Sequence, residues 1–168
     1  MDVHRWTVYE SPIGPLTLVA GERGLTNLDF PGRFSVPDGA EKGALPEVTE
    51  QLDAYFAGEL REFDLRLDPR GTPLQLAIWR ALLEIPYGET VSYGKQAEKI
   101  DPSLFETDVE PWQRARVVGA ANGRNPISIV VPCHRVIGAD GSLTGYGGGL
   151  DRKRALLDLE SNRQLAIL

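Results

Sequence analysis

Cysteine and histidine are scarce in this sequence: its 168 residues include one cysteine, Cys133, and two histidines. One cysteine excludes a disulfide within the chain and predicts a reducing, cytoplasmic location. So few ligands also exclude a structural zinc site of the usual cysteine and histidine type, and we expect no metal and no cofactor. No apolar run reaches the roughly 20 residues that span a bilayer. The first residues lack the charged and then apolar pattern of a signal peptide, so we expect no membrane partner.

The excess negative charge is confined to one part of the chain. The formal net charge is −6. Residues 1–70 contain 7 Lys and Arg against 13 Asp and Glu, whereas residues 71–168 contain 11 of each kind. The second part can therefore approach a phosphate backbone without net repulsion. It is not basic, however, so charge alone gives no evidence for a nucleic-acid partner.

Residues 1–70 predict a small antiparallel sheet with one helix. Three β-type runs alternate with turn residues, which is typical of a meander: 3–9, 16–20 and 25–30. Proline and glycine make 31–45 a predicted loop. A helix is expected from Pro46, because apolar residues then recur on one face, and Gly58 suits its end. One more strand is expected at 62–67.

A domain boundary is expected at Asp68–Gly71, which divides the chain into domains 1–70 and 71–168. Thr72 and Pro73 suit the N-cap and the first position of a helix. With two further helices, this one indicates a helix-turn-helix module: 72–83, 92–100 and 111–121.

An apolar run at 127–131 predicts a buried strand, which Pro132 ends. A glycine-rich turn at 146–149 then precedes the last helix, expected from about 151 to 162. The fold class that follows is α/β (α+β): an antiparallel sheet domain with a helix, then a helical domain that carries the only cysteine.

Cys133 is the candidate nucleophile. A lone cysteine in a reducing compartment is usually a small buried hydrophobe. Its neighbours favour a reactive thiol, because the cations His134 and Arg135 would lower its pKa from the free value of about 8.5. In an extended segment Cys133 and His134 project to opposite faces, which favours a bridging water over direct contact. Glu160 either orients the other imidazole nitrogen, completing a Cys–water–His–Glu relay, or is a solvated helix residue.

Five motifs follow one another in the second half of the chain: IPYGETVSYG at 85–94, VGAAN at 118–122, NP at 125–126, PCHRVI at 132–137 and GYGGGL at 145–150. In this order they resemble the O6-alkylguanine-DNA alkyltransferase family, also called methylated-DNA–protein-cysteine methyltransferases. The resemblance is dense over about 72–160 and looser upstream. It implies a ribonuclease-H-like N-terminal domain that supports a winged-helix-like C-terminal domain.

The activity that the resemblance implies is single-use DNA repair by a methylated-DNA–protein-cysteine S-methyltransferase. An alkylated guanine is flipped out of the duplex, because a side chain cannot reach an atom within the base stack. The Cys133 thiolate then takes the alkyl group from O6 as a thioether, so one protein molecule repairs one base. The partner is double-stranded DNA, bound by a monomer through the minor groove. Activity on O4-alkylthymine, the range of alkyl groups and cooperative binding are left open.

The resemblance also implies roles for individual residues. Tyr93 donates a proton toward the departing guanine oxygen, Arg116 fills the gap left in the base stack, and Asn125 braces the recognition helix against the cysteine turn. Without the resemblance, these are a packed tyrosine, a solvated arginine and an Asn-Pro turn. The implied sets are, for catalysis, Cys133, His134, Glu160, Tyr93 and Asn125; for DNA binding, Ser92, Tyr93, Ala115, Arg116 and Arg135; and for the guanine pocket, Asn122, Val136, Tyr146 and Gly147.

Two features depart from the family pattern. About ten extra residues lie between Ile100 and Arg114, and the acidic side chains among them would repel phosphate unless the segment folds away: Asp101, Glu106, Asp108 and Glu110. Asn122 stands where relatives often have an apolar residue. Two rival functions are a sensor that binds lesions without transfer and a cysteine hydrolase that turns over. Cys133 beside His134 disfavours the first, and the absence of an oxyanion-hole motif disfavours the second.

Overall fold

The structure is a computed structural model, and it describes residues 3–161 of the chain. The N-terminal part forms the expected antiparallel meander of β1 (Arg5–Ser11), β2 (Gly14–Gly21) and β3 (Gly24–Asp29). The segment predicted as a loop contains a short fourth strand, β4 (Glu41–Lys42), which pairs parallel with β1. The sheet order is therefore β3-β2-β1-β4.

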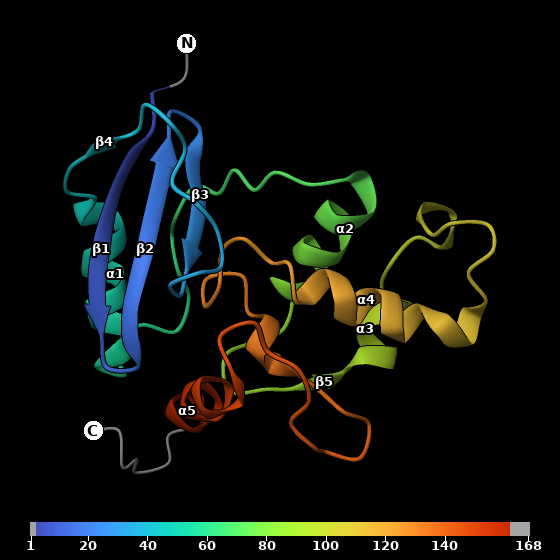
Figure 1. The fold of residues 1–168 in the computed structure, drawn as a ribbon. Helices are drawn as coiled ribbons and strands as arrows, with labels where there is room; N and C mark the ends of the chain where they lie inside the picture. Colours follow the sequence, from blue (N-terminus) through green and yellow to red (C-terminus); the bar gives the residue numbers. More distant parts are fainter. Residues whose placement is uncertain (1–2, 162–168) are drawn as a thin grey trace.

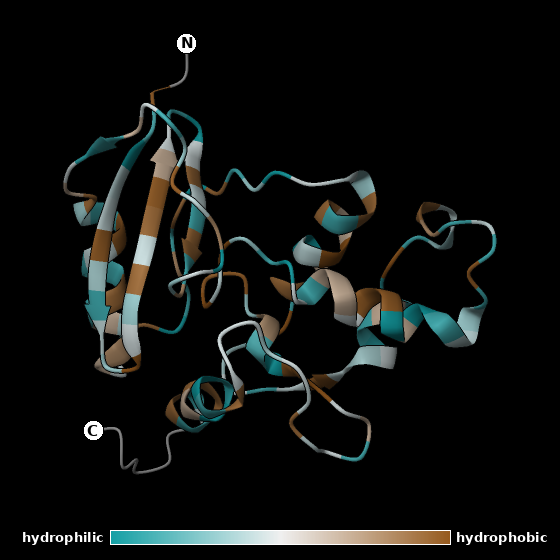
Figure 2. Ribbon diagram, viewed as in Figure 1, coloured by the Kyte–Doolittle hydropathy of each residue, from teal (hydrophilic) through white to brown (hydrophobic). Residues whose placement is uncertain are grey.

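Helix α1 (Pro46–Phe56) covers one face of this sheet (Figure 1). It begins at Pro46, as predicted, and its buried residues recur on one side: Val48, Leu52, Tyr55 and Phe56. They form one core with alternate residues of β2, such as Leu16 and Leu18, and Figure 2 shows the hydrophobic residues along that strand.

The predictions of strands at 62–67 and 127–131 are wrong, and both fail at the outer edge of β3. That edge is divided between two segments, each of which makes a single parallel bridge: Leu67 with Leu25, and Ile127 with Leu28. Beyond its bridge the second segment turns, with Ile129 at φ 72°. Its apolar residues are buried because the core surrounds this turn, not because it belongs to a sheet. The division of β3 ties the N-terminal sheet to the segment that leads into Cys133.

Three helices build the predicted helix-turn-helix region: α2 (Pro73–Leu82), α3 (Tyr93–Glu98) and α4 (Arg114–Asn122). Thr72 caps α2 through a reciprocal capping box with Gln75. Ser92 caps α3 by accepting a hydrogen bond from the Lys95 amide at 3.1 Å. The inserted residues between α3 and α4 form two short 3₁₀ turns, η1 (Pro102–Leu104) and η2 (Pro111–Gln113).

The cysteine lies in a 3₁₀ turn, η3 (Cys133–Arg135), which continues into β6 (Val136–Ile137). Strand β6 pairs parallel with β5 (Val91–Ser92), so the start of α3 lies beside the cysteine turn. Helix α5 (Leu150–Glu160) follows the glycine-rich segment, and its expected end at Asn162 lies outside the described residues. Among the helices of residues 3–161, none has the length and apolar character needed to cross a membrane.

Candidate active site

The backbone around Cys133 is a tight turn, so the opposite projection of Cys133 and His134 that holds for an extended segment does not apply here. The Cys133 amide donates to the Val131 carbonyl at 2.9 Å, and the Arg135 amide donates to the Pro132 carbonyl at 3.0 Å. Asn125 fixes the preceding turn, because its Nδ2 donates to Val131 O at 2.8 Å and its Oδ1 accepts from the Ile127 amide at 3.0 Å. Asn125 therefore holds the turn that precedes Cys133, and its predicted bracing of the recognition helix stays a prediction.

The Cys133 thiol is buried and neutral at rest. Only 7% of the residue is exposed, and burial raises the pKa of Cys133 to about 11. The Asn125 amide and the Lys153 ammonium lower this pKa, whereas the Asp29 carboxylate adds to the rise. The expectation that His134 and Arg135 would ionise the thiol is wrong, because both bind Glu160 instead.

Glu160 is the centre of a buried hydrogen-bond network and not a solvated helix residue. Its Oε2 lies 2.7 Å from His134 Nε2 and accepts from the Tyr55 hydroxyl at 2.6 Å. Its Oε1 accepts from Arg135 Nε at 2.7 Å. Burial alone would raise the pKa of Glu160, but the His134 ring and the Arg135 guanidinium hold it well below its usual range. Glu160 thus fixes the orientation of the His134 ring.

Arg135 is part of this network and not of the surface. Besides Glu160, its guanidinium contacts the Ile85 carbonyl, which accepts from Nη1 at 2.6 Å. The residue is 7% exposed. The prediction of a DNA contact at Arg135 is therefore wrong. A cation next to a nucleophile suggested a phosphate contact, but the guanidinium binds the buried carboxylate of Glu160 instead.

The His134 Nδ1 atom lies on the turn of Cys133 and is a buried polar atom with no hydrogen-bond partner among residues 3–161. Buried polar groups are nearly always paired, so this atom can take a proton or a hydrogen bond from a neighbouring group during a reaction. Burial raises the pKa of Tyr146 well above its usual value, and the neighbouring Cys133 adds to the rise. Tyr146 packs against the same core as Cys133, and its place in the guanine pocket stays a prediction.

Two other predicted site residues make different contacts. Asn122 faces α3, where its Nδ2 donates to Gln96 Oε1 at 2.7 Å and its Oδ1 accepts from Gln96 Nε2 at 3.0 Å. Gln96 thus pairs with both the nitrogen and the oxygen of the Asn122 amide, and a place for Asn122 in the guanine pocket stays a prediction. Tyr93 donates its hydroxyl proton to the Thr144 carbonyl at 2.9 Å. Its ring also packs toward Gly119 of α4, so Tyr93 connects the glycine-rich segment to the helix-turn-helix.

The predicted DNA-contacting residues Ser92, Ala115 and Arg116 lie at the first turns of α3 and α4. Arg116 is exposed and free to project from the surface, and Ala115 is half-buried. The helices carrying them lie on the side of the molecule away from the sheet (Figure 1). The structure therefore separates the buried turn that carries Cys133 from an exposed helical face.

Comparison with known proteins agrees with this arrangement over nearly the full chain. The family model of the 6-O-methylguanine DNA methyltransferase ribonuclease-like domain matches residues 4–69, and that of the DNA binding domain matches residues 73–162. This chain belongs to the 6-O-methylguanine DNA methyltransferase family. The family resemblance and the fold class predicted from the sequence are thereby confirmed.

Individual relatives cover the chain equally well. A methylated-DNA–protein-cysteine methyltransferase of Mycobacterium tuberculosis is 52% identical over 99% of this chain and 97% of its own length. One of Methanosarcina acetivorans is 48% identical over 94% of this chain and 98% of its own length. The crystal structure of M. tuberculosis OGT in complex with DNA matches with a TM-score of 0.82 at 52% identity, over 98% of this chain and 96% of that one.

Lys153 is a site residue of this methyltransferase family member to which the sequence assigned no role. It is fully buried on α5, and its Nζ donates to the carbonyls of Val136 at 2.6 Å, Thr144 at 2.9 Å and Gly145 at 3.3 Å. Burial lowers its pKa. Lys153 thus ties the backbone of the predicted pocket residue Val136 to that of Thr144 and Gly145. A lysine within a charged helix ordinarily indicates a solvated face, so its sequence carried no signal of this role.

Arg33 is a second residue that the sequence did not single out. From the loop after β3, its guanidinium donates to the Gly123 carbonyl at the end of α4 and lies 3.5 Å from the Asp29 carboxylate. It also lies against Gly147, where a Cβ would collide with it. A side chain at the predicted pocket residue Gly147 would therefore displace the far end of Arg33 from its present position.

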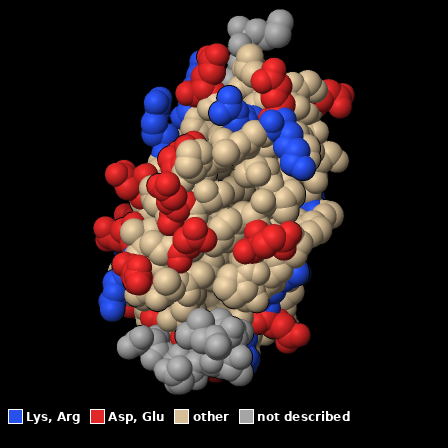
Figure 3. All heavy atoms as spheres, turned by 90° about the vertical axis from the view of Figure 1, so that its left-hand side faces the viewer, with Lys and Arg blue, Asp and Glu red and all other residues tan. Residues whose placement is uncertain are grey.

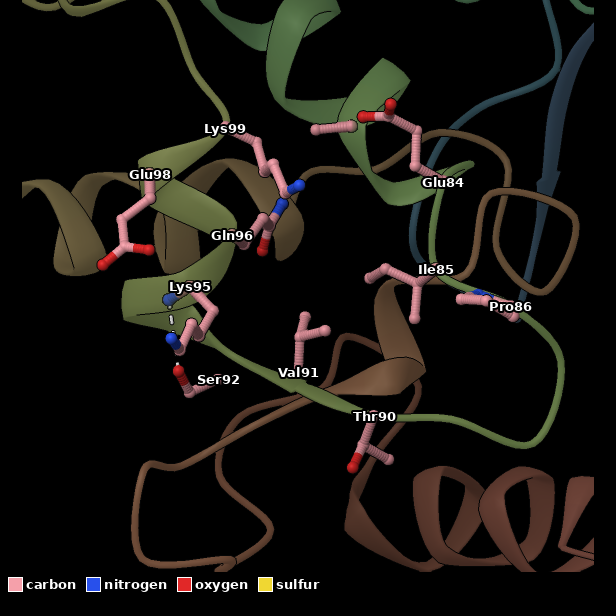
Figure 4. A pocket seen from close by; sticks show the side chains of 11 residues that line it. Glu84, Ile85, Pro86, Thr90, Val91, Ser92, Lys95, Gln96, Glu98 and Lys99 are labelled. Carbon is pink, nitrogen blue, oxygen red and sulfur yellow. Dashed lines mark hydrogen bonds between the residues drawn. The ribbon is translucent and has the colours of Figure 1, made fainter.

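A cavity of about 610 Å³ between α2, β5 and α3 is a different feature from the reaction centre. Figure 4 shows Ile85 and Val91 on its apolar side and Lys95, Lys99 and Glu84 around it. Cys133 does not line this cavity. Within residues 3–161, no group of three or more metal-ligating side chains is placed to hold a metal ion.

Proposed function

We propose that this protein repairs alkylated DNA by transferring one alkyl group from O6 of guanine to Cys133, once per molecule. The observation that carries the proposal is the 2.7 Å contact between His134 and Glu160. His134 lies on the same turn as Cys133, the only cysteine of this chain, and a relative that is 52% identical is a methylated-DNA–protein-cysteine methyltransferase. Because the thiol is neutral at rest, it needs a base, and the unpartnered His134 Nδ1 is the available one.

Proton transfer comes first in this mechanism. The Cys133 thiol gives its proton to His134 Nδ1, either directly or through one water molecule. The positive charge that forms on the imidazole lies next to the Glu160 carboxylate, which stabilises it. An uncharged thiol in the free protein and an ionised one during the reaction are therefore compatible, because His134 takes the proton before the sulfur attacks.

Alkyl transfer follows. A sulfur–carbon bond forms as the carbon–O6 bond breaks, and the electron pair of that bond leaves with guanine. We assign the proton that the departing base takes up to the Tyr93 hydroxyl, which His134 or solvent then restores. Tyr93 now donates to Thr144, so guanine would replace that carbonyl as its partner. The product is a thioether, which leaves no thiol for a second cycle.

DNA would be held by the exposed first turns of α3 and α4, with Arg116 entering the stack where the base has left it. M. tuberculosis OGT has been crystallised in complex with DNA, which supports double-stranded DNA as the partner here. Contact through helix ends and the minor groove suits a protein whose second half carries no net charge. Its single cysteine fits a reducing compartment, and we place the protein in the cytoplasm.

Intact mass spectrometry tests this function directly. Incubation with a duplex that contains one O6-methylguanine should add one methyl group to the protein, saturate at one per molecule, and place it on Cys133 in a peptide map. Cys133→Ser should bind the duplex and gain no mass. Binding without a mass increase in the native protein would favour a lesion sensor, and repaired base in excess of protein would favour a turnover enzyme.

A further inference from the structure

Trp112 is the most exposed large hydrophobic side chain among residues 3–161, with 79% of its surface accessible. Single exposed hydrophobic residues are common, so exposure alone assigns no role. Tryptophan is nevertheless the side chain that contributes most when a partner covers it. What distinguishes Trp112 is its position, which three observations define.

The inserted segment that carries Trp112 is anchored to the core. Phe105 is 6% exposed within the core, and the Arg114 guanidinium lies over its ring at 5.3 Å. At the other end of the segment, the Asp101 carboxylate accepts hydrogen bonds from the amide and hydroxyl of Ser103, both at 2.9 Å. Trp112 is thus presented by a fixed element and not by a free loop.

This segment lies at the end of the molecule farthest from the sheet, where α4 also begins (Figure 1). The 3₁₀ turn η2 runs directly into α4, and the residues at the junction, Gln113 and Arg114, both have right-handed helical dihedral angles. Residues four apart in such a stretch share a face. Trp112 and Arg116 therefore lie on the same side of this stretch, about one turn apart, and both are exposed.

We propose that Trp112 is a DNA-contacting residue that packs into the minor groove beside Arg116. The inference rests on the proposed function, since its partner is the duplex that Arg116 enters. An indole ring covers sugar and base edges in the groove without needing a positive charge. The exposed acidic residues Glu106, Asp108 and Glu110 oppose a phosphate contact by this segment, so its contact with the duplex has to come from the indole ring. The insertion thus extends the recognition helix by one aromatic contact.

Equilibrium binding of a fluorescein-labelled undamaged duplex tests this contact, because no transfer occurs on it. Trp112→Ala should weaken binding about tenfold, in the range of aromatic contacts to nucleic acid, and Trp112→Phe by less. The slope of log K against log salt should stay the same, since no phosphate contact is lost. Val8→Ala, which trims a residue 43% exposed on β1, is the matched control and should leave binding unchanged. Tryptophan emission should change on DNA addition in the native protein, and this change should vanish in Trp112→Phe.

Alkyl transfer from the free base O6-methylguanine separates this inference from the proposed function, since the free base has no groove. Native protein and Trp112→Ala should react with it at the same rate. Equal dissociation constants for native protein and Trp112→Ala, with no emission change, would overturn the role of Trp112. So would a change in self-association by sedimentation without a change in DNA binding. A protein that transfers nothing from either substrate would overturn the proposed function, and the binding comparison would still decide the role of Trp112.

Discussion

The two halves of the chain bury different kinds of residue. Of the ten buried polar or charged residues among residues 3–161, two lie before residue 71 and eight after it. The N-terminal half instead keeps its charge outside: Figure 3 shows Asp and Glu gathered on its outer face, and Glu47, Glu50 and Asp53 are exposed along α1. An apolar core is sufficient to fold a sheet with a helix. A polar core is costly unless every group is paired, so it indicates where the chemistry resides.

The contacts between the halves refine this contrast. Tyr55 of α1 donates to Glu160, the Asp29 carboxylate accepts from the Ser128 hydroxyl at 3.0 Å, and Arg33 donates to the end of α4. Each contact ends on an element that positions the cysteine turn or the recognition helix. The N-terminal half therefore takes part in the site as a scaffold, although it supplies no reacting group.

The largest expected effect comes from removing the charge at the centre of the polar core. Glu160→Gln should lower the free energy of unfolding by about 3 kcal/mol, because it leaves the buried Arg135 guanidinium without its counterion. Chemical denaturation at pH 7 measures this change. Glu84→Gln, an exposed glutamate of the same half, is the control and should change stability by less than about 0.5 kcal/mol.

The same variant has a predicted pH dependence. The folded-state pKa of Glu160 is depressed. The Glu160 carboxylate therefore stabilises the fold above the ordinary carboxyl pKa, and this stabilisation is lost as the pH falls from that value toward the depressed pKa. The difference between native protein and Glu160→Gln should therefore narrow below about pH 4.5. A difference that stays constant down to pH 3 would show that the charge is not its source.

Local signals predicted the helices well because their causes are local. The Thr72 and Ser92 caps, the Pro46 start and the Pro111 opening of the third helical stretch all lie where expected. The strand at 127–131 could not be distinguished from a buried turn, since apolar residues fill both. The conformation of this segment depends on its pairing with the edge of β3, which lies about a hundred residues earlier in the chain.

The candidate site shows the same division. The motifs identified Cys133, His134 and Asn125 because their spacing is local. The burial that makes the thiol neutral, and the pairing that removes Arg135 from the surface, depend on α5 closing over the turn. Nor could the sequence show which of the six charged residues of that helix face inward, namely Lys153 and Glu160. Three-dimensional contacts decide these cases.

The thiol itself gives the next effect in size. With a pKa of about 11 in the folded protein against 9.0 for the ordinary value, about a hundredfold less thiolate is present at pH 8 than in the unfolded chain. Alkylation of folded protein by iodoacetamide should accelerate about tenfold per pH unit from 8 to 10, whereas the denatured protein should level off above about pH 9. Because the pKa of Cys133 is higher in the folded than in the unfolded protein, the free energy of unfolding should fall with rising pH. The loss should begin near pH 9 and amount to roughly 2–3 kcal/mol by about pH 11. A plateau near neutral pH would mean that the thiolate exists at rest.

The smallest effect tests whether the N-terminal half truly contributes to the site. Tyr55→Phe removes one hydroxyl that donates to Glu160 and should lower the free energy of unfolding by about 1.5 kcal/mol, because the bond is buried and its acceptor is charged. Tyr9→Phe removes the same kind of bond, a 2.6 Å contact with Asp53 at the surface, and should cost less than about 0.5 kcal/mol. A change in stability alone would not show whether Tyr55 affects the reaction. The rate of alkyl transfer from a duplex that contains O6-methylguanine is therefore measured as well. It should fall for Tyr55→Phe, since Glu160 loses one of the contacts that align His134, and stay unchanged for Tyr9→Phe. Equal rates for both variants would confine the alignment of His134 to the C-terminal half.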